Sequence, residues 1–118
     1  MQWTFCTFNC VSSSRHAYKV AALRHMNKAS EAKNKNARIV LPNGSLFDGI
    51  GYGAKGYATG ELCFNTAMTG YQEIISDPSY ADQIIVFTFP HIGNVGVHRE
   101  DNESQKPRAR GIITRLKP

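Results

Sequence analysis

The chain has 118 residues, of which 42% are apolar and 19% are charged, and its formal net charge is +5. These values are ordinary for a single globular domain or for part of one. No run of 18 apolar residues occurs, which excludes a membrane-spanning helix, so we expect no membrane partner.

The positive charge is concentrated near the amino terminus. Six of the 14 basic residues and one of the nine acidic residues fall in residues 1–36, so residues 37–118 carry eight of each sign. A neutral folded region lacks the basic surface that binding to a phosphate backbone requires. We therefore expect no nucleic-acid partner.

Residues 1–36 differ in composition from the rest and are interpreted as a leader or disordered extension. Basic and serine residues without an acid before Glu31 suit a transit peptide, whereas the interrupted apolar stretch argues against a secretory signal. A spurious extension is the remaining alternative, with Met26 as the true start. The expected location is cytoplasmic, or the mitochondrion or plastid if the leader is a transit peptide.

The pattern from residue 37 onward is mainly that of β-strands. Residues 38–49 predict a hairpin, because Pro42-Asn43-Gly44 is a turn signal between two apolar runs. We expect a glycine-rich connection over residues 49–60 and a third strand over residues 61–65.

One short helix and two further strands are predicted in the second half. The helix spans residues 70–76 and ends before Pro78, which disfavours a helical residue ahead of it. The remaining elements are a central strand over 83–89, a loop over 91–108 and a last strand over 111–116. No closing element follows this strand, so we expect it to lack a partner.

A glycine motif at Gly51–Gly56 matches the spacing G-x-G-x-x-G. A dinucleotide site requires a helix that begins on this motif, but the residues that follow it predict a strand. We therefore interpret the motif as a flexible loop between strands.

Polar residues are dense between Asn65 and Tyr80. Glu73 could act as a base, but the favoured interpretation is a capped helix with Thr69 as its N-cap. The turn at Asp77-Pro78 presents Ser79, whose hydroxyl can donate and accept a hydrogen bond. Ser79 could thus be a ligand contact or a simple turn residue; no base is evident to make it a nucleophile.

The histidines and cysteines do not predict a metal site. The spacing of His91 and His98 is not that of a standard site, so His91 is interpreted as a hydrogen-bonding loop residue and His98 as exposed. Cys6 and Cys10 lack further ligands nearby, and Cys63 is expected to be a small buried hydrophobe. Three cysteines form no disulfide framework, which fits a reducing compartment.

Three blocks of sequence resemble one family over residues 37–116. They are FNTAMTGYQEIISDPSYADQI, FPHIGNVGV and the acidic run Glu100–Ser104. The family is that of the small, glutamine-using subunit of carbamoyl phosphate synthetase, and the resemblance is to its amino-terminal domain. It implies an α+β, β-rich fold with layered β/β/α architecture, here incomplete at the carboxyl terminus.

The resemblance also implies a function. The enzyme is a ligase that forms carbamoyl phosphate from glutamine, bicarbonate and ATP for arginine and pyrimidine biosynthesis. The expected partners are a large subunit, which uses ATP and a metal ion, and a glutamine amidotransferase domain that would follow residues 37–118. No cofactor is expected on this chain. A docking role for Glu100–Ser104, otherwise a solvated loop, stays open.

Within the family, the serine that matches Ser79 contacts glutamine, which makes Ser79 the one implied substrate-binding residue. No catalytic residue is implied, because the family's cysteine nucleophile lies in a Gly-x-Cys-x-Gly element that this sequence lacks. We therefore expect the chain alone to be inactive. The alternatives are a stand-alone interaction module without catalysis and the product of a decayed gene.

Overall fold

The structure is a computed structural model that describes residues 4–7, 20–23 and 35–116. Its strands in chain order are β1 (Thr4–Thr7), β2 (Val20–Leu23), β3 (Ala37–Val40), β4 (Leu46–Gly53), β5 (Tyr57–Asn65), β6 (Gln83–Phe87) and β7 (Gly111–Thr114). The helical segments are α1 (Tyr71–Ser76) and the 3-10 turns η1 (Pro78–Tyr80) and η2 (Arg99–Asp101).

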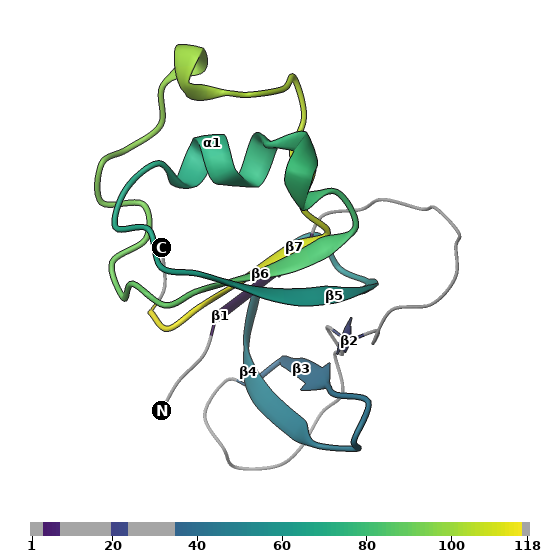
Figure 1. The fold of residues 1–118 in the computed structure, drawn as a ribbon. Coiled ribbons are helices and arrows are strands. Elements are labelled where there is room, and N and C mark those ends of the chain that lie inside the picture. Colours follow the sequence, from purple (N-terminus) through teal and green to yellow (C-terminus); the bar gives the residue numbers. More distant parts are fainter. Residues whose placement is uncertain (1–3, 8–19, 24–34, 117–118) are drawn as a thin grey trace.

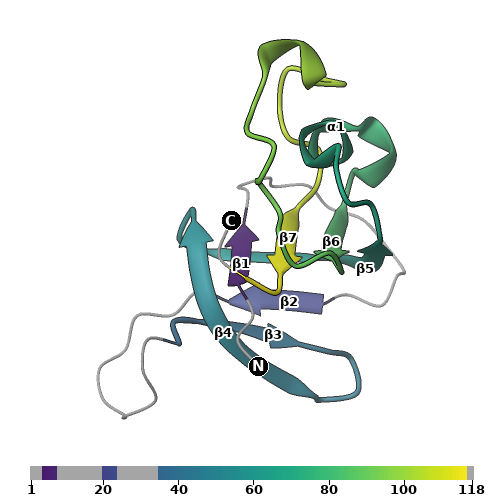
Figure 2. The same ribbon diagram turned by 90° about the vertical axis from the view of Figure 1, so that its left-hand side faces the viewer.

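The strands form a closed barrel in the order β1-β4-β3-β2-β5-β6-β7. Strands β5, β6 and β7 are parallel to one another, whereas β2, β3 and β4 form antiparallel pairs. Helix α1 covers the outer face of the parallel strands, and β2, β3 and β4 lie on the opposite side (Figures 1 and 2). The fold is thus a mixed α/β domain with few helices, in agreement with the predicted β-rich class, while the layered β/β/α type stays a prediction.

Two apolar clusters form the core. The inner cluster, inside the barrel, contains the side chains of Ala37, Ile39, Ile84, Val86 and Ile113. The outer cluster, between the parallel strands and α1, contains those of Tyr71, Ile85, Phe87, Ile92, Ala109 and Ile112. Successive residues of β6 alternate between the two clusters, because side chains of a strand point to opposite faces. This explains why four successive residues of the predicted central strand, 84–87, are all apolar.

The predicted hairpin over residues 38–49 is confirmed, with β3 and β4 paired in antiparallel fashion around the turn. The glycine-rich segment 49–60 was wrongly interpreted as a flexible connection. Strand β4 continues to Gly53 and β5 begins at Tyr57, so the connection is only residues 54–56. Gly49, Gly51 and Gly60 are buried within these strands, which is typical of glycines where neighbouring backbones approach closely.

The expectation that the last strand lacks a partner was also wrong. Strand β7 pairs in parallel with β6 on one side and in antiparallel fashion with β1 on the other. Strands β1 and β2 both lie within residues 1–36, the segment interpreted as a leader. The domain boundary at residue 36 stays a prediction, but eight residues before it contribute backbone pairs to the barrel.

In the part of the chain that the structure describes, no helix is long and apolar enough to cross a membrane.

Candidate functional site

Helix α1 begins at a left-handed residue. Its N-cap is Gly70, with φ of 75° and no side-chain capping bond, so the prediction of Thr69 as the cap was wrong. A positive φ favours glycine. The cap therefore lies at Gly70, one residue after Thr69, and the helix begins at Tyr71. Glu73 lies in the first turn, where its negative charge stabilises the helix dipole. The structure thus gives Glu73 a structural role.

Tyr71 joins the helix to the loop that follows β6. The residue is buried, and its ring meets Phe87 edge-on, with the ring centroids 6.1 Å apart. The Tyr71 hydroxyl lies 3.1 Å from the carbonyl oxygen of His91 and also bonds to Asn94 Oδ1. A buried hydroxyl needs such partners, and these bonds place the start of the 91–108 loop beside the first turn of the helix.

Two polar residues one turn apart hold the rest of this loop. Gln72 accepts a hydrogen bond from the His98 N–H at 2.9 Å and donates one to Asn102 Oδ1 at 2.8 Å. Ser76 Oγ accepts a bond from the Glu103 N–H at 2.9 Å, and the Ser104 hydroxyl donates to the Ser76 carbonyl. The 98–104 loop is therefore attached to α1 on the side away from the sheet (Figure 1).

Ser79 is exposed on η1, directly after α1. Its N–H donates to Asp77 Oδ1 at 2.7 Å, so the Asp77 side chain caps this short 3-10 helix. Hydrogen bonds from the Ser79 N–H and hydroxyl hold the pKa of Asp77 below its ordinary value. The predicted turn is confirmed, and Ser79 is presented to solvent at a fixed point of the backbone.

Tyr80 anchors the other end of η1. Its ring packs against the outer cluster, and its hydroxyl accepts a hydrogen bond of 3.0 Å from Asn65 Nδ2. Asn65 is the last residue of β5, and its carbonyl accepts the N–H of Thr88 at 3.0 Å. The η1 turn is therefore tied to the ends of two central strands.

His91 and His98 do not converge on a common site. The His91 ring packs edge-on against Phe89 at a centroid distance of 5.9 Å, and its carbonyl accepts from Tyr71. His98 is exposed, as predicted, and its Nδ1 accepts a bond from the Glu100 N–H at 3.4 Å. Among residues 4–7, 20–23 and 35–116, no three His, Cys, Asp or Glu side chains are grouped to hold a metal ion.

Cys63 lies on β5 and packs against the outer cluster, but it is only half-buried. Burial raises the pKa of its thiol above the ordinary value. A raised pKa disfavours the thiolate, which is the nucleophilic form. The geometry therefore supports the interpretation of Cys63 as a packing residue.

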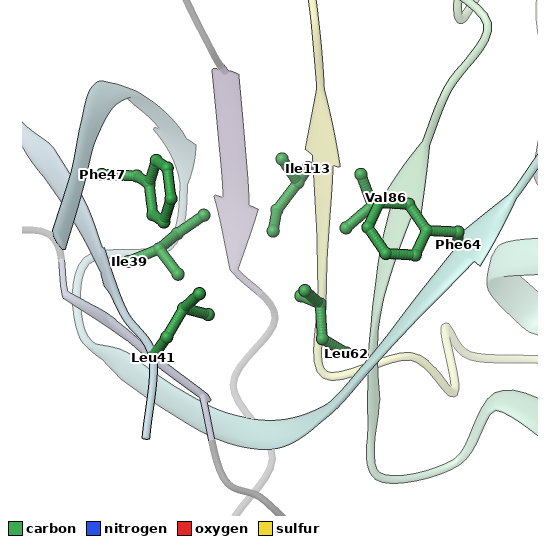
Figure 3. Close-up of a pocket in the computed structure, with 7 residues that line it drawn as sticks. All are labelled: Ile39, Leu41, Phe47, Leu62, Phe64, Val86 and Ile113. Carbon is green, nitrogen blue, oxygen red and sulfur yellow. The ribbon is translucent and has the colours of Figure 1, made fainter. Parts of the chain in front are cut away.

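A pocket of about 200 Å³ opens into the barrel interior. Its lining residues are Ile39, Leu41, Phe47, Leu62, Phe64, Val86 and Ile113. The side chains from β3 and β4 face those from β5, β6 and β7 across the pocket (Figure 3). Phe47 and Phe64 remain 46% and 71% exposed, respectively. An entirely apolar lining cannot satisfy the polar groups of a small amino acid, so this pocket is a contact surface for apolar groups.

The polar site is therefore the surface formed by α1, η1 and the 98–104 loop. The sequence pointed to Asp77 and Ser79 and included Asn65 and Tyr80 in its polar stretch. It did not predict the hydrogen bond that joins Asn65 to Tyr80, and it did not single out Ser76. The i, i+4 spacing of Gln72 and Ser76 was a usable signal, because it places both side chains on one face of a helix. The pairing of Asn65 with Tyr80 joins residues 15 positions apart and had no local signal.

Comparisons with known proteins give a consistent result. Residues 39–117 match the family described as "Carbamoyl-phosphate synthase small chain, CPSase domain". The chain is similar to proteins named carbamoyl phosphate synthase small chain from Ruegeria pomeroyi, with 60% identity over 82 residues, and from Photobacterium profundum, with 53% identity over 85 residues. These matches cover 70% and 72% of this chain but only 21% and 22% of the two relatives.

Proposed function

Since the chain belongs to the family of carbamoyl-phosphate synthase small chains, we propose that it acts as the amino-terminal part of a glutamine-hydrolysing carbamoyl phosphate synthase. This ligase would form carbamoyl phosphate from glutamine, bicarbonate and ATP for arginine and pyrimidine biosynthesis. The observation that carries the proposal is the continuous match over residues 39–117, which includes α1, η1 and the 98–104 loop. A cytoplasmic location belongs to the proposal and is supported by the free thiol of Cys63.

In this proposal, Ser79 borders the glutamine site. Its exposure on a capped turn supports this role, since an accessible hydroxyl can bond to the polar groups of an amino acid. The cysteine, histidine and glutamate of the amidotransferase would come from the part of the small chain that follows this segment. Ser79 would help to bind glutamine without taking part in its hydrolysis.

We propose that the exposed apolar residues contribute to docking on the large subunit, which would use ATP and a metal ion; no cofactor is assigned to this chain. Large exposed apolar side chains at the pocket rim support this role, because such patches commonly mark protein interfaces. Phe64→Ser in the assembled enzyme is expected to weaken copurification of the two subunits. Unchanged copurification would remove the pocket rim from the interface.

The proposal predicts that the 118-residue chain releases no ammonia from glutamine. The raised pKa of Cys63 keeps its thiol protonated. The Ser79 hydroxyl bonds to the carboxylate of Asp77, whose lowered pKa makes it a weak base that does not activate a serine nucleophile. Ammonia would be measured in a coupled assay with purified chain, with Cys63→Ala as the matched variant. Release that is abolished by Cys63→Ala would contradict the proposal and make Cys63 a nucleophile.

The glutamine contact is tested in a full-length chimera. Residues 39–117 replace the matching part of the Ruegeria pomeroyi small chain, which is assembled with the large chain of the same organism. Ser79→Ala is expected to raise the KM for glutamine about five-fold, as for the loss of one ordinary hydrogen bond. A KM equal to that of the unmodified chimera would remove Ser79 from the glutamine site.

A further inference from the structure

We infer that Asn65 and Tyr80 are positioning residues, whose mutual hydrogen bond holds Ser79 in place for glutamine; this inference rests on the proposed function. The bond is 3.0 Å long, and it connects the end of β5 to η1. Neither residue is assigned a contact with glutamine. Their effect would act entirely through the position of Ser79.

The first step of the argument is the limited support of η1 itself. The turn contains only three residues, Pro78–Tyr80, and its backbone bonds are Tyr80 N–H to the Asp77 carbonyl at 3.1 Å and Ala81 N–H to the Pro78 carbonyl at 3.0 Å. Both bonds are local, and so is the side-chain cap from Asp77 to Ser79. Local bonds fix the shape of the turn, but they do not fix its place relative to the sheet.

The second step is the anchor that Tyr80 provides. The Tyr80 ring packs against the outer cluster, while its hydroxyl meets Asn65 at the end of β5. This side chain therefore extends from the turn to the end of a central strand. Because Tyr80 is covalently next to Ser79, a shift of the Tyr80 side chain is transmitted directly to the Ser79 backbone.

The third step is the rigidity of Asn65. Its Oδ1 accepts the N–H of Ala67 at 2.9 Å, which fixes the orientation of the amide and leaves Nδ2 to donate to Tyr80. Its carbonyl accepts both the N–H and the hydroxyl of Thr88, at 3.0 and 3.3 Å. Asn65 is therefore held by β5 and by the residue after β6. A catalytic or binding residue requires such support to keep its geometry within about 0.5 Å.

The test is a double-mutant cycle in the full-length chimera, with Tyr80→Phe and Ser79→Ala introduced singly and together. Tyr80→Phe removes only the hydroxyl and keeps the ring in the outer cluster. It is expected to raise the KM for glutamine about three- to five-fold with a much smaller change in kcat, and Asn65→Ala should act in the same direction. The combined variant should have the KM of Ser79→Ala alone, since coupled residues give non-additive effects.

Tyr57→Phe is the matched control, because it removes the hydroxyl of a 75% exposed tyrosine elsewhere on β5. It should leave the KM unchanged. If Ser79→Ala raises the KM but Tyr80→Phe does not, or if the two effects add, the positioning role is overturned and the glutamine contact survives. If Ser79→Ala has no effect, the proposed glutamine contact fails and the positioning role fails with it.

Discussion

At the residue scale, the fold leaves no room for a side chain at Gly60. A Cβ at this position would lie 2.5 Å from the carbonyl oxygen of Asp82, and backbone cannot move aside as a flexible side chain does. Asp82 itself has a left-handed φ of 66°, and its carboxylate pairs with the buried Arg110, with 2.8 Å between Oδ1 and Nε. The turn before β6 is therefore held between Gly60 of β5 and Arg110, the residue before β7.

We predict that Gly60→Ala lowers the free energy of unfolding by about 1–3 kcal/mol, because the added methyl forces a backbone shift. Gly44→Ala is the comparison for backbone strain alone: unlike Gly60, Gly44 has a positive φ, at 83°, and nothing lies within 4 Å of the added Cβ. The control carries backbone strain without a collision. Urea denaturation measures the stability of both variants, and a Gly60→Ala chain as stable as the unmodified chain would show that the close approach to Asp82 is absent.

Asp77 gives a prediction for acid pH. Bonds from Ser79 depress the pKa of its carboxyl in the folded chain, so ionised Asp77 stabilises the fold above its unfolded pKa of about 3.9. That contribution is lost as the pH falls through the lower, folded pKa. The difference in Tm between the unmodified chain and Asp77→Asn should therefore shrink from pH 5 down to about pH 2. A difference that stays constant over this range would contradict the Asp77–Ser79 contact.

At the element scale, the existence of α1 could be predicted from the sequence, but its N-cap could not. The spacing of Tyr71, Ile74 and Ile75 predicted the helix, and these residues do pack against the sheet. The cap was predicted one residue early, because Thr69 has good capping chemistry whereas the left-handed backbone of Gly70 depends on how the chain enters from β5. The glycines of residues 49–60 were wrongly interpreted as a loop, because a glycine-rich stretch of sequence does not show whether its glycines lie in strands or in a loop.

The attachment of the 98–104 loop to α1 is tested with Ser76→Ala. Ser76 is 2% exposed, and its hydroxyl is the partner of the Glu103 N–H. Loss of this acceptor should reduce stability by about 1–3 kcal/mol and speed amide exchange at Glu103. Ser45→Ala, in the turn between β3 and β4, is the matched control and should leave that exchange unchanged. Equal exchange in both variants would show that the loop is held elsewhere.

At the scale of the whole molecule, barrel closure depends on segments far apart in the chain. Strand β1 fills the position between β4 and β7, and β2 fills that between β3 and β5. Composition favoured a leader for residues 1–36, and no sequence pattern there indicated that β1 pairs with β4 and with the distant strand β7. Such long-range pairs cannot be predicted from local propensity, which explains why β7 was expected to be an unpaired edge.

We predict that the chain beginning at Met26 is less stable than the full 118 residues, because it lacks both β1 and β2. Four neighbouring strands would then expose unpaired backbone groups, which also favour aggregation. Urea denaturation and sedimentation of the two forms would measure this. Equal stability would support the interpretation of residues 1–36 as a dispensable leader.

The most direct test of the proposed function is the unmodified chimera, in which residues 39–117 replace their counterpart in the Ruegeria pomeroyi small chain. Carbamoyl phosphate synthesis would be measured with glutamine and, separately, with ammonia as the nitrogen donor. We predict that the assembled enzyme uses glutamine at a rate close to that of the Ruegeria enzyme. Synthesis from ammonia without synthesis from glutamine would contradict the proposal that this segment functions as the amino-terminal part of the small subunit.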